Sequence, residues 1–116
     1  MILRFSILPE RFAIARLAAD AAVPELRGEF FSITRTAEEL SVIREEADGE
    51  WRCLALQGPF ALTEIGIAAE FTRVLAEARV AVLVVSTYDT DYVLVAADEI
   101  DRAVAALLAA GHDVTR

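Results

Sequence analysis

The chain has 116 residues, of which 56% are apolar and 26% charged, and its 19 acidic and 11 basic residues give a formal net charge of -8. A chain of this length forms one domain or two very small ones, and it buries about two-thirds of its unfolded surface, so its core needs neither disulfides nor metals. The acidic balance disfavours binding to nucleic acid or an anionic membrane, and no apolar run approaches the roughly 20 residues of a membrane span, so we expect a cytoplasmic protein.

Residues 1–49 are predicted to contain a strand, a short helix and a hairpin. The predicted elements are a strand over Ile2–Leu8, a helix over Glu10–Asp20, and two hairpin strands over Phe30–Thr36 and Leu40–Glu46. Pro9 ends the first strand because proline has no backbone donor. The stretch Glu38–Glu46 would also suit a helix by propensity, but Ser41, Val42 and Ile43 favour the hairpin.

Residues 50–116 are predicted to form a complete β-α-β-β-α-β module. The predicted elements are a strand over Trp51–Gln57, a helix over Thr63–Ala78, a hairpin of Arg79–Thr87 and Tyr92–Val95, a helix from an N-cap at Asp98 to Gly111, and an edge strand over His112–Thr115. This order is the split βαβ arrangement, an α+β fold in which two helices cover one face of an antiparallel sheet. The first half repeats the opening order β-α-β-β, which suggests an abbreviated module at 1–49 and a complete one at 50–116.

Catalytic and metal chemistry find little support in the residue pattern. The only imidazole, His112, follows a predicted helix end and is expected at the surface, whereas Cys53 lies in a predicted strand and is expected to be buried. The sequence has no glycine-rich phosphate loop. We therefore predict that the protein is not an enzyme and uses no cofactor or metal. Most acids, among them Glu70, are expected on solvated faces.

Two loops of the second half carry candidate binding chemistry. The run Ser86–Asp91 has six successive polar residues, which form either a capped hairpin turn or a set of groups converging on a small polar ligand. Gly66 lies in the predicted first turn of a helix, where free amides suit a carboxylate. Glycine in a helix is unfavourable by about 1 kcal/mol relative to alanine, so Gly66 indicates either close packing or the approach of a ligand.

A family resemblance extends over Trp51–Val114 and is carried by Leu56–Phe60, Thr63–Ile67, Ser86–Val95 and Ala110–His112. These segments resemble the ACT domain in its CASTOR-like branch, which includes small bacterial proteins of two ACT modules. Residues 1–50 are similar to the first module of that branch in element order and in the Phe30–Thr34 strand. The implied fold is a ferredoxin-like βαββαβ ACT module preceded by an abbreviated βαββ ACT-like module.

The resemblance implies a regulatory protein that binds an amino acid at an interface between ACT modules, and we expect a homodimer. It places Asp91 against the ligand's amino or guanidinium group, with Ser86 and Thr87 at the same strand end. The ligand's carboxylate would meet the backbone of the segment Ile65, Gly66 and Ile67. The residue chemistry agrees, because a zwitterion needs a carboxylate at one end and free amides at the other.

Two other functions are consistent with parts of this pattern. One is a structural or protein-interaction module without a ligand, which would use an exposed sheet face or edge as its binding surface. The other is a small ferredoxin-like hydrolase similar to acylphosphatases, which is disfavoured because that family relies on an asparagine beside an arginine and this chain has no asparagine. Which amino acid binds, and whether one chain or a dimer forms the pocket, do not follow from the sequence.

Overall fold

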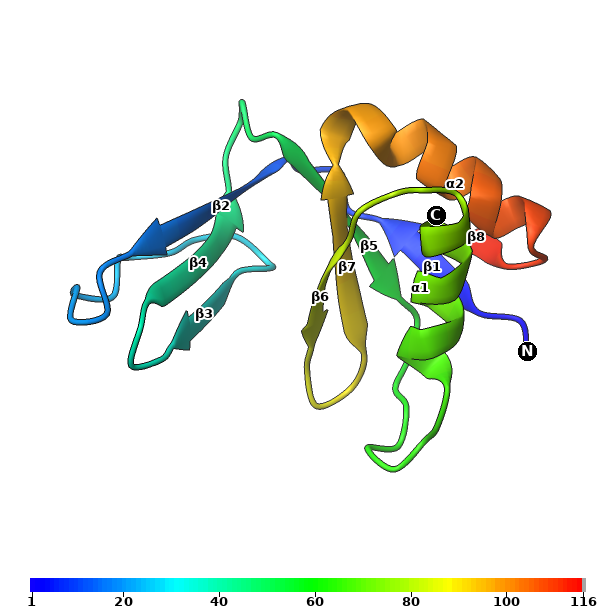
Figure 1. The fold of residues 1–116 in the computed structure, drawn as a ribbon, viewed down its shortest axis with the longest axis horizontal. Coiled ribbons are helices and arrows are strands. Elements are labelled where there is room, and N and C mark those ends of the chain that lie inside the picture. Colours follow the sequence, from blue (N-terminus) through cyan, green and yellow to red (C-terminus); the bar gives the residue numbers. More distant parts are fainter. Residues whose placement is uncertain (116) are drawn as a thin grey trace.

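Figure 1 shows a computed structural model of the chain, which describes residues 1–115 as one sheet with two helices packed on the same side. The elements are β1 (Arg4–Ile7), β2 (Phe12–Leu17), β3 (Ser32–Arg35), β4 (Leu40–Glu45), β5 (Trp51–Leu56), α1 (Ile67–Glu77), β6 (Leu83–Ser86), β7 (Asp91–Ala96), a 3-10 turn (Ala97–Glu99), α2 (Ile100–Ala109) and β8 (Asp113–Thr115). The eight strands follow the order β3-β4-β2-β5-β1-β8, and β7 joins β5 to β6.

The second half has the predicted βαββαβ order, and both helices cover one face of its strands (Figure 1). Alternation along β5 and β7 divides their side chains between two cores. Leu54 and Val93 face the helices, where Phe71 and Leu75 of α1 and Leu107 of α2 complete the main core. The mixed α+β class is confirmed, and so is the edge position of β8, whose one partner among residues 1–115 is β1.

Strand β1 comes from the first half of the chain but completes the sheet of the second. It pairs antiparallel with β5 and parallel with β8, so it lies between the first and last strands of the βαββαβ unit. Phe5 is fully buried there and meets Phe71 of α1 edge to face, with ring centroids 5.6 Å apart. Burial of an aromatic ring contributes about 1.5–3 kcal/mol, which anchors the N-terminal strand under the helices. The division of the chain at residues 49 and 50 stays a prediction.

The predicted helix over Glu10–Asp20 is wrong, because this segment contains strand β2. All six residues of β2 pair antiparallel with β4, and β4 pairs on its other side with β3. Phe12 and Ile14 show the period of two that a strand requires, and both face the same core. The first half therefore consists of the four strands β1 to β4 without the predicted helix. The predicted hairpin of β3 and β4 is confirmed.

A second core fills the face of β5 and β7 that the helices leave open. Its aromatic centre is Phe30, which stacks on Tyr92 at 4.4 Å between ring centroids and meets Phe12 edge to face at 5.7 Å. Cys53 and Leu94 are fully buried in the same cluster, so the prediction of a buried Cys53 is confirmed. The N-terminal half of the chain thus covers the part of the second face around Cys53 and Leu94.

Both helices begin later than predicted. Helix α1 starts at Ile67 rather than Thr63, and Gly66 is its N-cap with φ of 91°, a left-handed conformation that favours glycine. The reason for Gly66 is therefore backbone conformation and not a position inside the helix. Asp98 lies in the 3-10 turn, and the N-cap of α2 is Glu99 without a side-chain hydrogen bond, so the predicted Asp98 cap is wrong.

Candidate functional site

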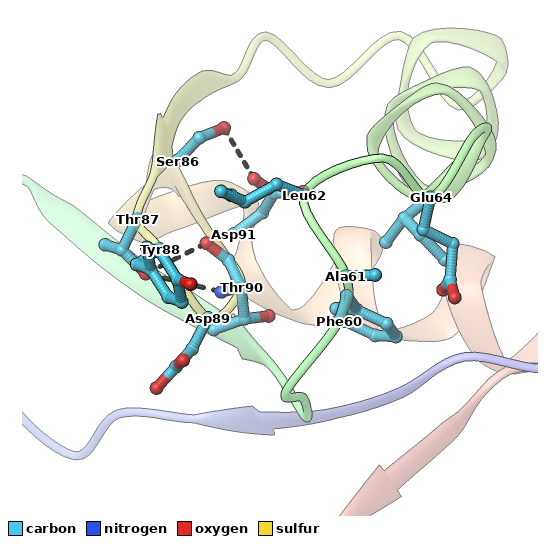
Figure 2. Close-up of a pocket in the computed structure, with 11 residues that line it drawn as sticks. Phe60, Ala61, Leu62, Glu64, Ser86, Thr87, Tyr88, Asp89, Thr90 and Asp91 are labelled. Atoms are coloured by element: carbon cyan, nitrogen blue, oxygen red, sulfur yellow. Dashed lines mark hydrogen bonds between the residues drawn. The ribbon is translucent and has the colours of Figure 1, made fainter.

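A cleft of about 170 Å³ opens between the loop that precedes α1 and the turn that joins β6 to β7 (Figure 2). Its lining residues are Phe60, Ala61, Leu62, Glu64, Ile67, Ser86, Thr87, Tyr88, Asp89, Thr90 and Asp91. The two loops singled out in the sequence therefore meet in space. The volume is below the roughly 300–1,000 Å³ of sites for drug-sized ligands, so the cleft suits a small metabolite.

Hydrogen bonds within the turn hold most of its polar groups (Figure 2). Ser86 and Asp91 are partners across β6 and β7, and the Ser86 hydroxyl donates to Asp91 Oδ1 at 2.5 Å. Thr87 N–H donates to the Thr90 carbonyl at 2.8 Å, and Thr90 N–H donates to Thr87 Oγ1 at 3.3 Å. The run Ser86–Asp91 is thus a capped hairpin turn, and it also places Asp91 at the wall of a cleft.

The loop before α1 is fixed directly to this turn. Phe60 N–H donates to the Asp89 carbonyl at 2.8 Å, and the Thr90 hydroxyl donates to the Leu56 carbonyl at 2.8 Å. A Cβ at Gly58 would lie 2.8 Å from the Asp89 carbonyl oxygen, so only glycine permits this approach. The two walls of the cleft are therefore held together at its base by one backbone and one side-chain hydrogen bond.

The six predicted ligand-binding residues are only partly brought together. Ser86, Thr87, Asp91 and Ile67 line the cleft. Gly66 shapes the start of α1 without lining the cleft, and Ile65 has 90% of its surface exposed beside it. Phe60, Ala61, Leu62, Glu64, Tyr88, Asp89 and Thr90 complete the lining but were not assigned to a site. The signal for Tyr88, Asp89 and Thr90 was their place in the polar run, whereas Glu64 had no signal of its own.

The charges of the cleft are all negative. Glu64, Asp89 and Asp91 contribute three carboxylates, and none of the arginines among residues 1–115 lines the wall. In Figure 2 the Asp89 carboxylate points away from the loop of residues 60–64, and the Glu64 side chain extends from the side of that loop opposite the turn, whereas Asp91 lies beside Ser86. Helix α1 starts next to the cleft without a side-chain cap, so its first amides are available. An ammonium group and a small anionic group would each find a complementary partner.

A buried polar link supports α1 behind the cleft and corrects two predictions. His112 is 1% exposed rather than at the surface. Its Nδ1 accepts a hydrogen bond from the Leu3 backbone N–H at 3.0 Å, so Nε2 carries the proton and donates to Glu70 Oε2 at 2.9 Å. Glu70 is accordingly part of this link and not a freely solvated acid. Hydrogen bonds from Arg73 and then from His112 hold the pKa of Glu70 below its ordinary value of 4.5.

Two structural absences apply to the described part of the chain. Over residues 1–115, no group of three or more His, Cys, Asp or Glu side chains is placed to hold a metal ion. Within the same residues, neither helix has the length and apolar character needed to cross a membrane.

Comparison with known families gives two matches that together span most of the chain. A family model described as the ACT domain matches residues 46–109, which is more than half of the chain and includes the entire cleft. A second model, described as an N-terminal domain, matches residues 10–47. Both β1 and β8, which pair with each other, lie outside the two matched ranges. No curated protein matches the chain.

Solved structures share the fold. A crystal structure of a protein from Agobacterium tumefaciens is 34% identical, with a TM-score of 0.89 over 99% of this chain and 93% of that one. A Vibrio cholerae protein described as of unknown function and as a possible transport protein is 17% identical, with a TM-score of 0.72 over 92% of this chain and 88% of that one. At that identity the second similarity concerns the fold alone.

Proposed function

Because the chain belongs to the ACT domain family, we propose that it binds an amino acid in the cleft between residues 58–66 and the 86–91 turn and thereby regulates a partner protein. ACT domains are regulatory small-ligand-binding modules and not catalysts. The proposal includes a place in the CASTOR-like branch, a cytoplasmic location, and an abbreviated module at 1–49 before the complete one at 50–116. Separate family matches to residues 10–47 and 46–109 support the two-module arrangement.

One observation carries the proposal: the cleft combines an acidic wall with an uncapped helix start. In the proposed complex, the ligand's ammonium group lies against the Asp91 carboxylate, and its carboxylate meets the first amides of α1 at Ile67. Charge-assisted hydrogen bonds of this kind are about twice as strong as neutral ones. The helix dipole adds a further favourable interaction with the carboxylate. The ligand's side chain would contact Phe60 and Leu62 on the loop.

The proposed homodimer has support from strand β6. Within the described residues 1–115 this strand pairs with β7 alone, so its outer edge has unpaired backbone groups there. Leu83 and Val84 on the same strand are 38% and 37% exposed. Pairing of two β6 edges would cover both features, and size-exclusion chromatography with light scattering would measure the mass. Replacement of Val84 by arginine should yield a monomer if this edge is the dimer contact.

A thermal-shift screen of the twenty amino acids tests ligand binding. A ligand present at about ten times its Kd stabilises the folded protein by about 1.4 kcal/mol, which raises Tm by about 4–8 °C for a domain of this size. We expect Asp91→Asn to abolish this shift, because asparagine keeps an acceptor for Ser86 but loses the charge. Absence of any shift at millimolar concentrations would refute the proposal.

A matched control uses the same chemical change away from the cleft. Asp48 lies exposed in the turn before β5, so Asp48→Asn removes one negative charge without touching the lining residues. The ligand-induced shift should be unchanged in this variant. A loss in both variants would mean that the net charge of the protein, and not a contact at Asp91, determines binding.

A protein-interaction module without a ligand is the second candidate. It is favoured by the apolar residues around the cleft, since Leu62 is 69% exposed and Ile65 90% exposed. Isolated exposed apolar residues are common, but these two lie on one loop, and Leu62 lines the cleft together with Ser86 of the β6 edge strand. A stoichiometric protein partner whose affinity is unaffected by all twenty amino acids and by Asp91→Asn would favour this function.

A further inference from the structure

A second hollow, of about 390 Å³, lies on the other side of Phe60 from the cleft. It forms at the end of the sheet where β1 and β8 begin and β5 has ended. Its volume lies within the roughly 300–1,000 Å³ of common small-molecule sites. Phe60 and Ile2 contribute apolar surface to it, and Ile2 is 69% exposed. Phe60 lines both the amino-acid cleft and this hollow, whereas Gly58 of the same loop lines the hollow but not the cleft.

Three polar side chains of the hollow come from neighbouring strands. Arg4 and Asp113 are register partners on the parallel strands β1 and β8. Gln57 follows β5, and its N–H donates to the Arg4 carbonyl at 2.8 Å, which makes it the neighbour of Arg4 on the other side. Register neighbours point to the same face of a sheet. Since Phe5 and His112 are buried toward the helices, Arg4 and Asp113 project to the opposite face.

The opposite charges of Arg4 and Asp113 do not neutralise each other. Among residues 1–115, neither side chain forms an ion pair, and none of Arg4, Gln57 and Asp113 has a side-chain hydrogen bond. Most other arginines with a role in the fold do bind a carbonyl or a carboxylate, as Arg11 binds the Gly49 carbonyl at 2.7 Å. A cation, an anion and an amide therefore remain available side by side at the rim of one hollow.

We infer that this hollow is a second small-molecule site, which takes a zwitterion with an apolar side chain. Arg4 and Asp113 are register partners on adjacent strands about 4.8 Å apart, so an α-carboxylate and an α-ammonium on one carbon can reach both side chains. The guanidinium of Arg4 presents a planar fork to the carboxylate, with the Gln57 amide beside it. Asp113 accepts from the ammonium group. The ligand's side chain packs on Ile2 and Phe60.

The affinity of such a site is in the millimolar range, because its charged groups are exposed and screened by water. The inference does not depend on the cleft at Asp91, since the two sites have different charged groups. A ligand bound at this hollow would bridge β1 and β8 and would therefore connect the N-terminal strand to the last strand of the βαββαβ unit.

The probe for the test is L-leucine, titrated into the full chain while backbone amide signals are followed by NMR. We expect shifts at Arg4, Gln57 and Asp113 that saturate at millimolar ligand. Arg4→Ala and Asp113→Asn should each weaken this binding by about tenfold or more. 4-Methylpentanoate lacks the amine of leucine and 3-methylbutylamine lacks its carboxylate, so each should bind at least about tenfold more weakly. Arg16→Ala, on β2 away from the hollow, should leave binding unchanged.

Each outcome decides the matter. Saturable shifts at the hollow that both variants remove would support the second site. Shifts confined to Thr87–Asp91 would overturn it while leaving the proposed function intact, and shifts at neither place would count against both. Equal binding of leucine and 4-methylpentanoate would overturn the zwitterion and leave a plain anion site. Unchanged urea midpoints in Arg4→Ala and Asp113→Asn exclude unfolding as the cause of lost binding.

Discussion

Replacement of His112 by alanine tests how much one buried side chain contributes to the stability of this fold. The imidazole of His112 accepts from the Leu3 N–H at 3.0 Å and donates to Glu70 at 2.9 Å, so it connects the N-terminal segment and the start of β8 to helix α1. It is 1% exposed and therefore has no water to replace either partner. Alanine removes both hydrogen bonds and leaves a void.

The expected loss of stability follows from the Leu3 N–H left without a partner and from the void, because Glu70 keeps its hydrogen bonds from Arg73. An unsatisfied buried N–H at Leu3 costs about 1–3 kcal/mol. A void of roughly 60 Å³, the size of an imidazole, costs about 1.4 kcal/mol at about 24 cal/mol per Å³. His112→Ala should therefore lower the free energy of unfolding by about 2.5–4.5 kcal/mol, a large share of the usual 5–15 kcal/mol. At a slope near 1.5 kcal/mol per M, the urea midpoint falls by about 1.7–3 M.

Urea denaturation followed by the fluorescence of Trp51 measures the effect, and His112→Asn provides the control. Asparagine Oδ1 occupies about the place of imidazole Nδ1, so this variant keeps an acceptor for the Leu3 N–H and should recover about 1–3 kcal/mol of the loss. Equal stability of the alanine and asparagine variants would show that the Leu3 hydrogen bond contributes nothing. An alanine variant within about 0.5 kcal/mol of the parent would refute the burial argument altogether.

Three further predictions concern local features of the structure. The residue after the C-cap of each helix is left-handed, Arg79 at φ 62° after α1 and Gly111 at φ 95° after α2. Arg79→Gly should therefore raise the free energy of unfolding by up to about 1 kcal/mol in urea denaturation, and Gly111→Ala should lower it by about 1–2 kcal/mol, although the alanine Cβ would meet nothing within 4 Å. Stabilisation by Gly111→Ala would contradict this. Burial raises the pKa of the Cys53 thiol to about 12, so a disulfide reagent at about pH 8 should label the native protein far more slowly than the protein in guanidinium chloride, and equally fast labelling would mean that the second core opens readily. Arg73 and His112 lower the pKa of Glu70 in the folded state, so the ionised carboxylate stabilises the protein at pH values above its ordinary pKa of 4.5, and this stabilisation is lost as the pH falls through the lowered pKa. In acid denaturation Glu70→Gln should flatten this part of the profile of stability against pH. An unchanged profile would exclude the contribution of Glu70.

The second half of the chain could be predicted from the sequence because its signals are local. Apolar residues at helical spacing in α1 and α2, and β-branched runs on either side of the polar turn, specify elements that need only their own neighbours to be recognised. The polar run at Ser86–Asp91 and Gly66 likewise indicated the two loops that meet at the cleft. An acidic turn and the start of a helix can each be recognised from a few adjacent residues, so both could be predicted without knowledge of the fold.

Tertiary structure decided the rest, since it depends on partners far away in the chain. Phe12–Leu17 has a weak preference of its own and becomes a strand because β4 provides six pairing residues. Strand β1 lies between β5 and β8 because Phe5 finds a buried place against Phe71, more than sixty positions away. His112 follows a helix end, where sequence alone predicts exposure, yet Leu3 and Glu70 close over it. Sequence thus determined the elements with strong local periodicity, and long-range pairing and burial determined the others.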